Sequence, residues 1–153
     1  MQNEGQELDI LLIEDNPNDA ELTLRALRAS VAGARVAHVD DGVKALDLIF
    51  GARGLAGRTA GKLPRLILLD LKLPKVDGLE VLRRIKGDER TRGVPVVVLT
   101  SSKEERDIRE SYLLGANSYL VKPVGFDEYL AAVREACRYW ISLNQRPVAK
   151  QAV

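Results

Sequence analysis

Five polar residues directly follow short apolar runs, and their types suit the handling of a phosphoryl group. Glu14 and Asp15 follow ILLI, Asp70 follows LILL, Thr100 follows VVVL, and Lys122 follows SYLV. Carboxylates that lie close together repel and raise one another's pKa unless a cation lies among them. Oxygen ligands with no histidine or cysteine beside them suit Mg²⁺, which prefers octahedral oxygen coordination. The three acids are therefore candidate magnesium ligands.

A lysine and a threonine opposite a metal-bound carboxylate would complete a site for phosphoryl transfer. The ammonium of Lys122 and the metal would neutralise the phosphoryl oxygens, and the hydroxyl of Thr100 would donate a hydrogen bond. Asp70 is then the candidate nucleophile, whose attack on phosphorus gives an aspartyl phosphate. Any one of these residues alone has an ordinary explanation, because acids near strand ends commonly form turns or caps. We assign that ordinary role to Asp40, Asp41 and Asp77.

The scaffold must bring these five positions to one edge. Short apolar runs bounded by turn residues indicate strands buried on both faces, and the sequence predicts them at 10–13, 36–39, 66–69, 96–99 and 118–121. A helix is predicted after each strand, the last from about residue 126 to 143. Strict alternation predicts an α/β fold, a flavodoxin-like doubly wound parallel sheet with strand order 2-1-3-4-5. That order places the first strand beside the third, so their carboxylates share the carboxyl edge.

Length and composition indicate one globular domain. Of 153 residues we expect 9–143 to form the domain, with an extended loop at 51–65, a flexible lead-in at 1–8 and a disordered tail at 144–153. The 23 basic and 22 acidic residues argue against a nucleic-acid domain or a polybasic membrane patch. A single cysteine, Cys137, excludes an internal disulfide and fits a reducing compartment. We therefore expect a cytoplasmic protein.

At these motifs the chain resembles the response-regulator receiver domains of two-component signalling. The match covers residues 9–143 and rests on LLIEDN, LLDLKLP, VDG, VVVLTSS and SYLVKP. The resemblance implies that Asp70 accepts a phosphoryl group from the phosphohistidine of a histidine kinase. It implies that Glu14 and Asp15 hold Mg²⁺, Asp15 directly, and that Asp70 and the backbone carbonyl of Lys72 complete the protein ligands.

The resemblance also assigns the phosphoryl contacts and a conformational switch. Thr100 and Lys122 would contact the phosphoryl group, and Tyr119 would be the switch aromatic that turns inward when Thr100 moves. The Lys122–Pro123 peptide bond is expected to be cis, which is affordable before proline. The protein would not be an enzyme in the usual sense, although it would promote its own phosphorylation and dephosphorylation.

More closely, the chain resembles the small single-domain receivers that serve phytochrome-type histidine kinases. The segments ELTLRAL, 51–65, DLKLPKVDG and RYWISL carry this likeness. Lys72 departs from it, because a polar uncharged residue is usual there. A cation two residues past Asp70 could alter the phosphoryl lifetime, or Lys72 could be an ordinary solvated lysine, and both interpretations stay open.

The last predicted helix carries more apolar surface than one core-facing stripe needs. Phe126, Leu130, Val133 and Cys137 form the stripe expected to cover the sheet. The further apolar side chains of Tyr139, Trp140 and Leu143 predict a homodimer built on this helix with the fifth strand or fourth helix. No output domain is expected after the receiver, so the signal would pass by protein contact or phosphorelay.

Two other functions are open on the residues alone. The fold could be a constitutive binding module in which phosphorylation is vestigial, although every part of the acceptor is present. It could also be a Mg²⁺-dependent phosphohydrolase acting on small molecules, although the sequence indicates no cap, lid or second catalytic acid.

Overall fold

Five parallel strands form the central sheet of the computed structural model, which describes residues 7–57 and 63–147. Their order is β2-β1-β3-β4-β5, as the sequence predicts. The strands are β1 (Ile10–Ile13), β2 (Val36–Val39), β3 (Leu66–Leu69), β4 (Val96–Thr100) and β5 (Ser118–Val121). The helices are α1 (Pro17–Ser30), α2 (Gly42–Phe50), η1 (Leu55–Gly57), α3 (Gly78–Gly87), α4 (Glu105–Leu113), α5 (Phe126–Cys137) and η3 (Arg138–Leu143). The predicted flavodoxin-like fold is confirmed.

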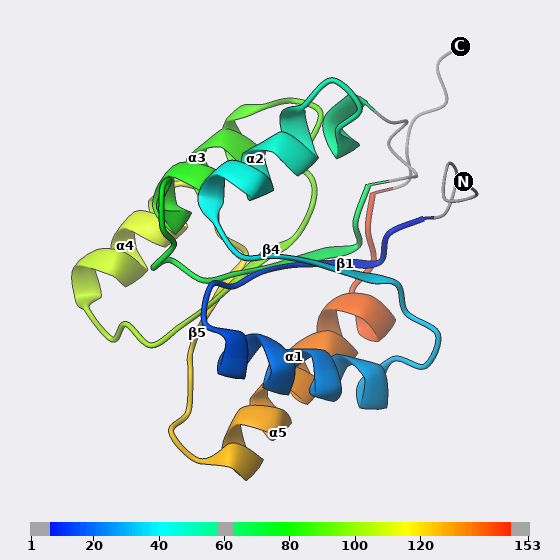
Figure 1. Ribbon diagram of the computed structural model, residues 1–153, viewed down its shortest axis with the longest axis vertical. Coiled ribbons are helices and arrows are strands. Elements are labelled where there is room, and N and C mark those ends of the chain that lie inside the picture. Colours follow the sequence, from blue (N-terminus) through cyan, green and yellow to red (C-terminus); the bar gives the residue numbers. More distant parts are fainter. Residues whose placement is uncertain (1–6, 58–62, 148–153) are drawn as a thin grey trace.

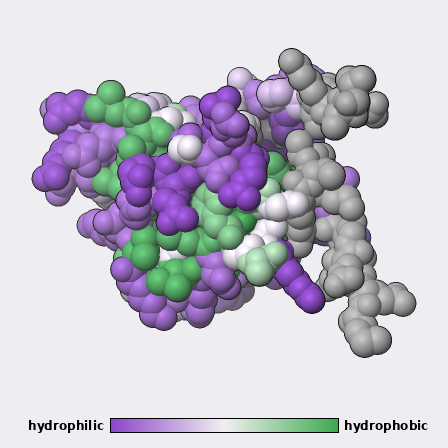
Figure 2. All heavy atoms as spheres, turned by 90° about the horizontal axis from the view of Figure 1, so that it is seen from above, coloured by the Kyte–Doolittle hydropathy of each residue, from purple (hydrophilic) through white to green (hydrophobic). Residues whose placement is uncertain are grey.

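Helices cover both faces of this sheet. Figure 1 shows α2 and α3 above the strands and α1 and α5 below them, with α4 on the upper side beside β5. Seen from above, over α2, α3 and α4, hydrophobic side chains form separate patches among hydrophilic ones (Figure 2). These helices present a mixed face to solvent, and their buried residues, such as Ile49 and Leu82, pack in the core.

Alternation along the strands divides the core into two layers. Leu11 and Ile13 of β1 pack in the layer with α2 and α3, whereas Ile10 and Leu12 pack in the layer with α1 and α5. All four residues are at most 2% exposed. Successive strand side chains point to opposite faces, so a sheet covered on both sides needs the continuous apolar runs seen in the sequence.

Three helices begin at polar caps that the sequence marks. Asn16 accepts from the backbone N–H groups of Asn18 and Asp19 at 3.0 and 3.1 Å. Asp41 accepts from the N–H of Lys44 at 2.6 Å, and Asp77 caps α3 in the same way. Each cap satisfies a donor that the first turn leaves free. The structural role assigned to Asp41 and Asp77 is confirmed.

The turn after β3 needs glycine at position 78. A Cβ atom there would lie 2.3 Å from the backbone oxygen of Asp70 and 2.5 Å from the Cα of Leu71. The Gly78 N–H donates to the Leu71 carbonyl at 2.8 Å, which closes the turn. Only a residue without a side chain lets α3 begin this close to the backbone of Asp70.

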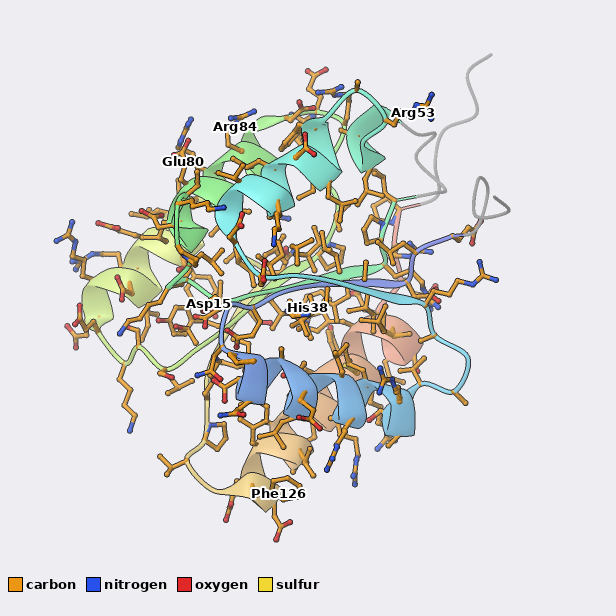
Figure 3. The ribbon with its side chains drawn as sticks, in the orientation of Figure 1. Asp15, His38, Arg53, Glu80, Arg84 and Phe126 are labelled. Atoms are coloured by element: carbon orange, nitrogen blue, oxygen red, sulfur yellow. The ribbon has the colours of Figure 1, made fainter. Side chains whose placement is uncertain are left out.

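The core-facing stripe predicted for the last helix is wrong at its first residue. Phe126 is 52% exposed, and Figure 3 shows it at the outer start of α5. Val133 and Cys137 of the predicted stripe are buried, together with Tyr129 and Ile141. These four side chains recur every four residues. An α-helix drifts from a four-residue spacing, but η3 continues α5 as a π-helix, whose wider turn keeps Ile141 on the sheet.

The predicted loop at 51–65 is regular structure in part. Within 51–65, η1 buries Leu55 and Ala56 on the core, so this part of the predicted loop is ordered structure. Residues 58–62, most of the predicted lead-in (1–6) and much of the predicted tail (148–153) lie outside the described residues.

The cis prediction for Lys122–Pro123 is wrong: every peptide bond in the described ranges is trans, the form that X–Pro bonds generally prefer. None of the described helices has the length and apolarity that crossing a membrane requires.

Candidate functional site

The strand registers align the ends of four strands. Ile13 of β1 lies opposite Leu69 of β3, so Glu14 and Asp70, which follow them, leave the sheet side by side. The backbone N–H of Asp70 donates to the Ile13 carbonyl at 3.0 Å. On the other side, the N–H of Lys122 donates to the Thr100 carbonyl at 2.7 Å. Figure 3 shows Asp15 at the same edge, where the chain leaves β1 for α1.

The ammonium of Lys122 is the centre of this edge. Its Nζ lies 2.9 Å from Oδ2 of Asp70 and 2.9 Å from Oδ2 of Asp19, and it also donates to Oε1 of Glu14. The side chains of Lys122, Glu14 and Asp70 are between 2% and 7% exposed. Three carboxylates therefore share one buried ammonium, whose three N–H groups are all used.

This arrangement shifts the pKa values of the buried groups. Burial would lower the pKa of Lys122, but hydrogen bonds to Glu14, Asp19 and Asp70 outweigh it and raise that pKa. Burial, with the neighbouring Asp70 carboxyl, raises the pKa of Glu14 to about 8. Burial also acts to raise the pKa of Asp70, but hydrogen bonds with Glu14 and Lys122 hold it below the usual range. Burial thus acts to raise the pKa of both acids, and for Asp70 the hydrogen bonds outweigh it.

The acids fit a divalent cation that prefers oxygen. Carboxylate oxygens of Glu14, Asp15 and Asp70 lie within 4.8 Å of one another. Two of these residues are buried, and three carboxylates here face the single ammonium of Lys122 or one another. A second cation among these oxygens would relieve the remaining repulsion. The backbone N–H of Lys72 donates to Oδ1 of Asp70 at 3.2 Å, and the side chain of Lys72 is exposed.

Thr100 and Tyr119 both form hydrogen bonds with the backbone of Ser102. Thr100 is fully buried, and its Oγ1 accepts from the N–H of Ser102 at 3.4 Å. The hydroxyl of Tyr119 donates to the Ser102 carbonyl at 2.9 Å. Ser102 also donates from Oγ to Asp107 in the first turn of α4, at 2.5 Å. A movement of Thr100 can therefore reach Tyr119 and α4 through the loop that holds Ser102.

Two residues near the site have contacts beyond the sequence prediction. Asp19, assigned only to the start of α1, bonds to Lys122 across 103 positions of sequence. Its place in the first turn of α1, directly after the end of β1, is the available signal, because that turn starts at the same edge of the sheet. His38 in β2 donates from Nε2 to the Glu14 carbonyl at 2.8 Å, which ties the edge strand to the acidic pair.

Comparison with known proteins assigns the family. Residues 10–134 match the family described as the response regulator receiver domain. The chain belongs to this family. The resemblance inferred from the motifs is confirmed, and the protein is a receiver-family signalling protein.

The most similar relatives include small response regulators. The chain is 46% identical over 138 residues to the probable methanogenesis regulatory protein FilR2 of Methanothrix harundinacea, covering 90% of this chain and 86% of that protein. The phosphorylated cyanobacterial phytochrome response regulator RcpA has a similar structure, with 37% identity, a TM-score of 0.84, and coverage of 94% and 100%. The Mn²⁺-bound form of response regulator Rcp1, a Synechocystis protein, gives 34% identity, a TM-score of 0.81, and coverage of 92% and 99%. The DNA-binding dual master transcriptional regulator RpaA and the DNA-binding response regulator MtrA are matched over 57% and 50% of their length.

Proposed function

We propose that this receiver is a cytoplasmic signalling protein that accepts a phosphoryl group from a histidine kinase onto Asp70. The observation that carries the proposal is the buried ammonium of Lys122 bonded to Asp70 and Glu14, beside the acidic cluster of Glu14, Asp15 and Asp70. A carboxylate that stays ionised, a cation beside it and oxygens for a metal are the parts that phosphoryl transfer to an acid requires.

The transfer is an in-line displacement at phosphorus. A carboxylate oxygen of Asp70 forms a bond to phosphorus while the phosphorus–nitrogen bond of phosphohistidine breaks. The bonding pair stays on that imidazole nitrogen, and because the other ring nitrogen carries a proton, the kinase histidine leaves as neutral imidazole. Lys122 then donates to a phosphoryl oxygen, and the Thr100 hydroxyl donates to another. When bound by Glu14, Asp15, Asp70 and the carbonyl of Lys72, Mg²⁺ supplies charge neutralisation for the phosphoryl oxygens.

The output is a change of the α4–β5–α5 face. The phosphoryl group would draw Thr100 toward Asp70 and pull on the Ser102 backbone, to which Tyr119 is bonded. Tyr119 would then turn inward and shift the population of conformers at this face. The signal would pass on by protein contact or phosphorelay. Likeness to RcpA and Rcp1 supports a phytochrome-type histidine kinase as donor.

Incubation of the wild-type protein with acetyl phosphate and Mg²⁺, followed by intact mass measurement, tests the proposal. We expect one phosphoryl adduct that forms only when Mg²⁺ is present. Absence of any adduct would contradict the proposal and favour a constitutive binding module. Steady phosphate release over many turnovers without an adduct would instead favour a phosphohydrolase.

Mg²⁺ should raise the melting temperature, because the cation binds the native acidic cluster and not the unfolded chain. At a concentration of about 100 times its dissociation constant the gain is about 2.7 kcal/mol. Thermal unfolding across millimolar Mg²⁺ measures it. Asp15→Asn removes an exposed candidate ligand and should reduce the gain, whereas Asp77→Asn should not. An unchanged wild-type melting temperature would contradict metal binding here.

Dimerisation through the α5 region is the second structural part of the proposal. A groove is lined by Leu120, Ala136, Tyr139 and Trp140. The side chains of Tyr139 and of Leu143, at the end of η3, are 50% and 57% exposed. Burying such apolar surface between two copies would stabilise a dimer. Light scattering at micromolar concentration should give a dimer that Leu143→Glu dissociates and the control Val43→Glu, on α2, does not. A monomeric wild type, with and without a phosphoryl mimic, would refute it.

A further inference from the structure

Asp19 is a carboxylate of the site that neither the candidate metal cluster nor the phosphoacceptor includes. Its Oδ2 lies 2.9 Å from Nζ of Lys122, and its side chain is 27% exposed. The backbone N–H of Asp19 donates to the capping side chain of Asn16 at 3.1 Å. The first turn of α1 therefore fixes the backbone of Asp19, while its carboxylate bonds to the buried lysine.

The three partners of Lys122 do not keep the same roles in a phosphorylated site. Asp70 would become the acyl phosphate, and Lys122 would have to exchange this bond for one to a phosphoryl oxygen. Glu14 belongs to the acidic cluster whose oxygens lie within 4.8 Å of one another, and would turn to the cation there. Asp19 lies outside that cluster, so its bond to Lys122 can stay unchanged.

We propose that Asp19 is a positioning residue, which holds the ammonium of Lys122 at the sheet edge throughout phosphoryl transfer. This inference rests on the proposed function of Asp70. One N–H of Lys122 stays with Asp19 while another passes from Asp70 to the phosphoryl group. A long lysine side chain anchored only by groups that change would have to reorganise before each transfer.

Two simpler roles for Asp19 make different predictions. An acid in the first turn stabilises a helix through the helix dipole, which affects melting but leaves the rate of adduct formation unchanged. A negative charge that merely repels an anionic phosphodonor would slow the reaction, so its removal would speed adduct formation. A positioning residue, in contrast, slows the reaction when it is removed.

The rate of adduct formation from acetyl phosphate at saturating Mg²⁺, followed by intact mass, separates these roles. Asp19→Asn should lower the rate roughly tenfold, while the Mg²⁺ concentration for half-maximal rate stays that of the wild type. Asp19→Glu keeps the charge but moves it, and should give an intermediate rate. The matched control is Glu21→Gln, which removes an exposed acid paired with Arg25 on the same helix and should keep the wild-type rate.

Several outcomes would overturn the inference. A wild-type or faster rate in Asp19→Asn removes the positioning role, and so does a variant that changes only its Mg²⁺ requirement. If Asp19→Asn does not fold, a wild-type rate in Asp19→Glu overturns it. When the wild type forms no adduct, the proposed function itself fails. A wild type that forms adduct beside an unaffected Asp19→Asn refutes the role of Asp19 alone.

Discussion

Asp70→Asn should abolish the phosphoryl adduct that we expect wild-type protein to form with acetyl phosphate and Mg²⁺. The amide nitrogen of asparagine is not a nucleophile at neutral pH, and the remaining carbonyl oxygen carries no charge to attack phosphorus. Asparagine has the same shape as aspartate, and its oxygen can still accept from the backbone N–H of Lys72. The variant should therefore fold, and intact mass should show only unmodified protein.

A matched control is available at the start of α3. Asp77→Asn makes the same chemical change in an exposed cap, and asparagine caps helices about as well as aspartate. Asp77→Asn should form adduct at the wild-type level. An adduct of equal yield in Asp70→Asn would place the phosphoryl group on another residue.

Lys122→Met should be the most destabilising single change at this edge. It removes the only cation bonded to Glu14, Asp19 and Asp70 in the described structure and leaves buried carboxylates unbalanced. Breaking a buried ion pair in this way costs about 3–5 kcal/mol. We expect a loss of about 3 kcal/mol near pH 8 with a chelator present, measured by urea unfolding.

The loss should shrink in acid. Without Lys122, burial and mutual repulsion raise the carboxyl pKa values above those of the unfolded chain, so the native state binds more protons. The free energy of unfolding of Lys122→Met then falls as pH rises. The fall begins near the pKa of carboxyls in the unfolded chain, about 4, and continues through the raised pKa values of the native carboxyls. In the wild type the pKa of Lys122 is raised, so Lys122 stays charged and keeps its contribution to stability over this whole pH range. Lys72→Met, which replaces an exposed lysine, is the control. A free energy of unfolding for Lys122→Met within about 1 kcal/mol of the wild-type value near pH 8 would contradict this account.

The sheet and its order follow from the sequence because the evidence for them is local and repeated. Five apolar runs, each ended by a polar residue and followed by a helical pattern, leave few alternatives to a doubly wound fold. The same runs place Glu14 and Asp70 at neighbouring strand ends, and the structure brings both to Lys122. Their chemical roles stay predictions.

The contacts that the sequence did not predict depend on side-chain reach and on helix geometry. Asp19 meets Lys122 only because α1 packs over the edge where β5 ends, a relation between elements far apart in sequence. Phe126 has the spacing of a core residue, but it is the first residue of α5 and is exposed there. The π-helical turns of η3 place Ile141 in the core, and no local pattern marks that change of pitch.

Chemical mapping of the phosphoryl group tests the central claim most directly. Wild-type protein is phosphorylated with acetyl phosphate and Mg²⁺, reduced with borohydride, digested, and its peptides are sequenced by mass spectrometry. Borohydride reduces an aspartyl phosphate to homoserine, so we predict homoserine at position 70 and aspartate at positions 15 and 19. Homoserine at another aspartate, or a phosphoryl group that survives reduction on a serine or threonine, would contradict the assignment of Asp70 as phosphoacceptor.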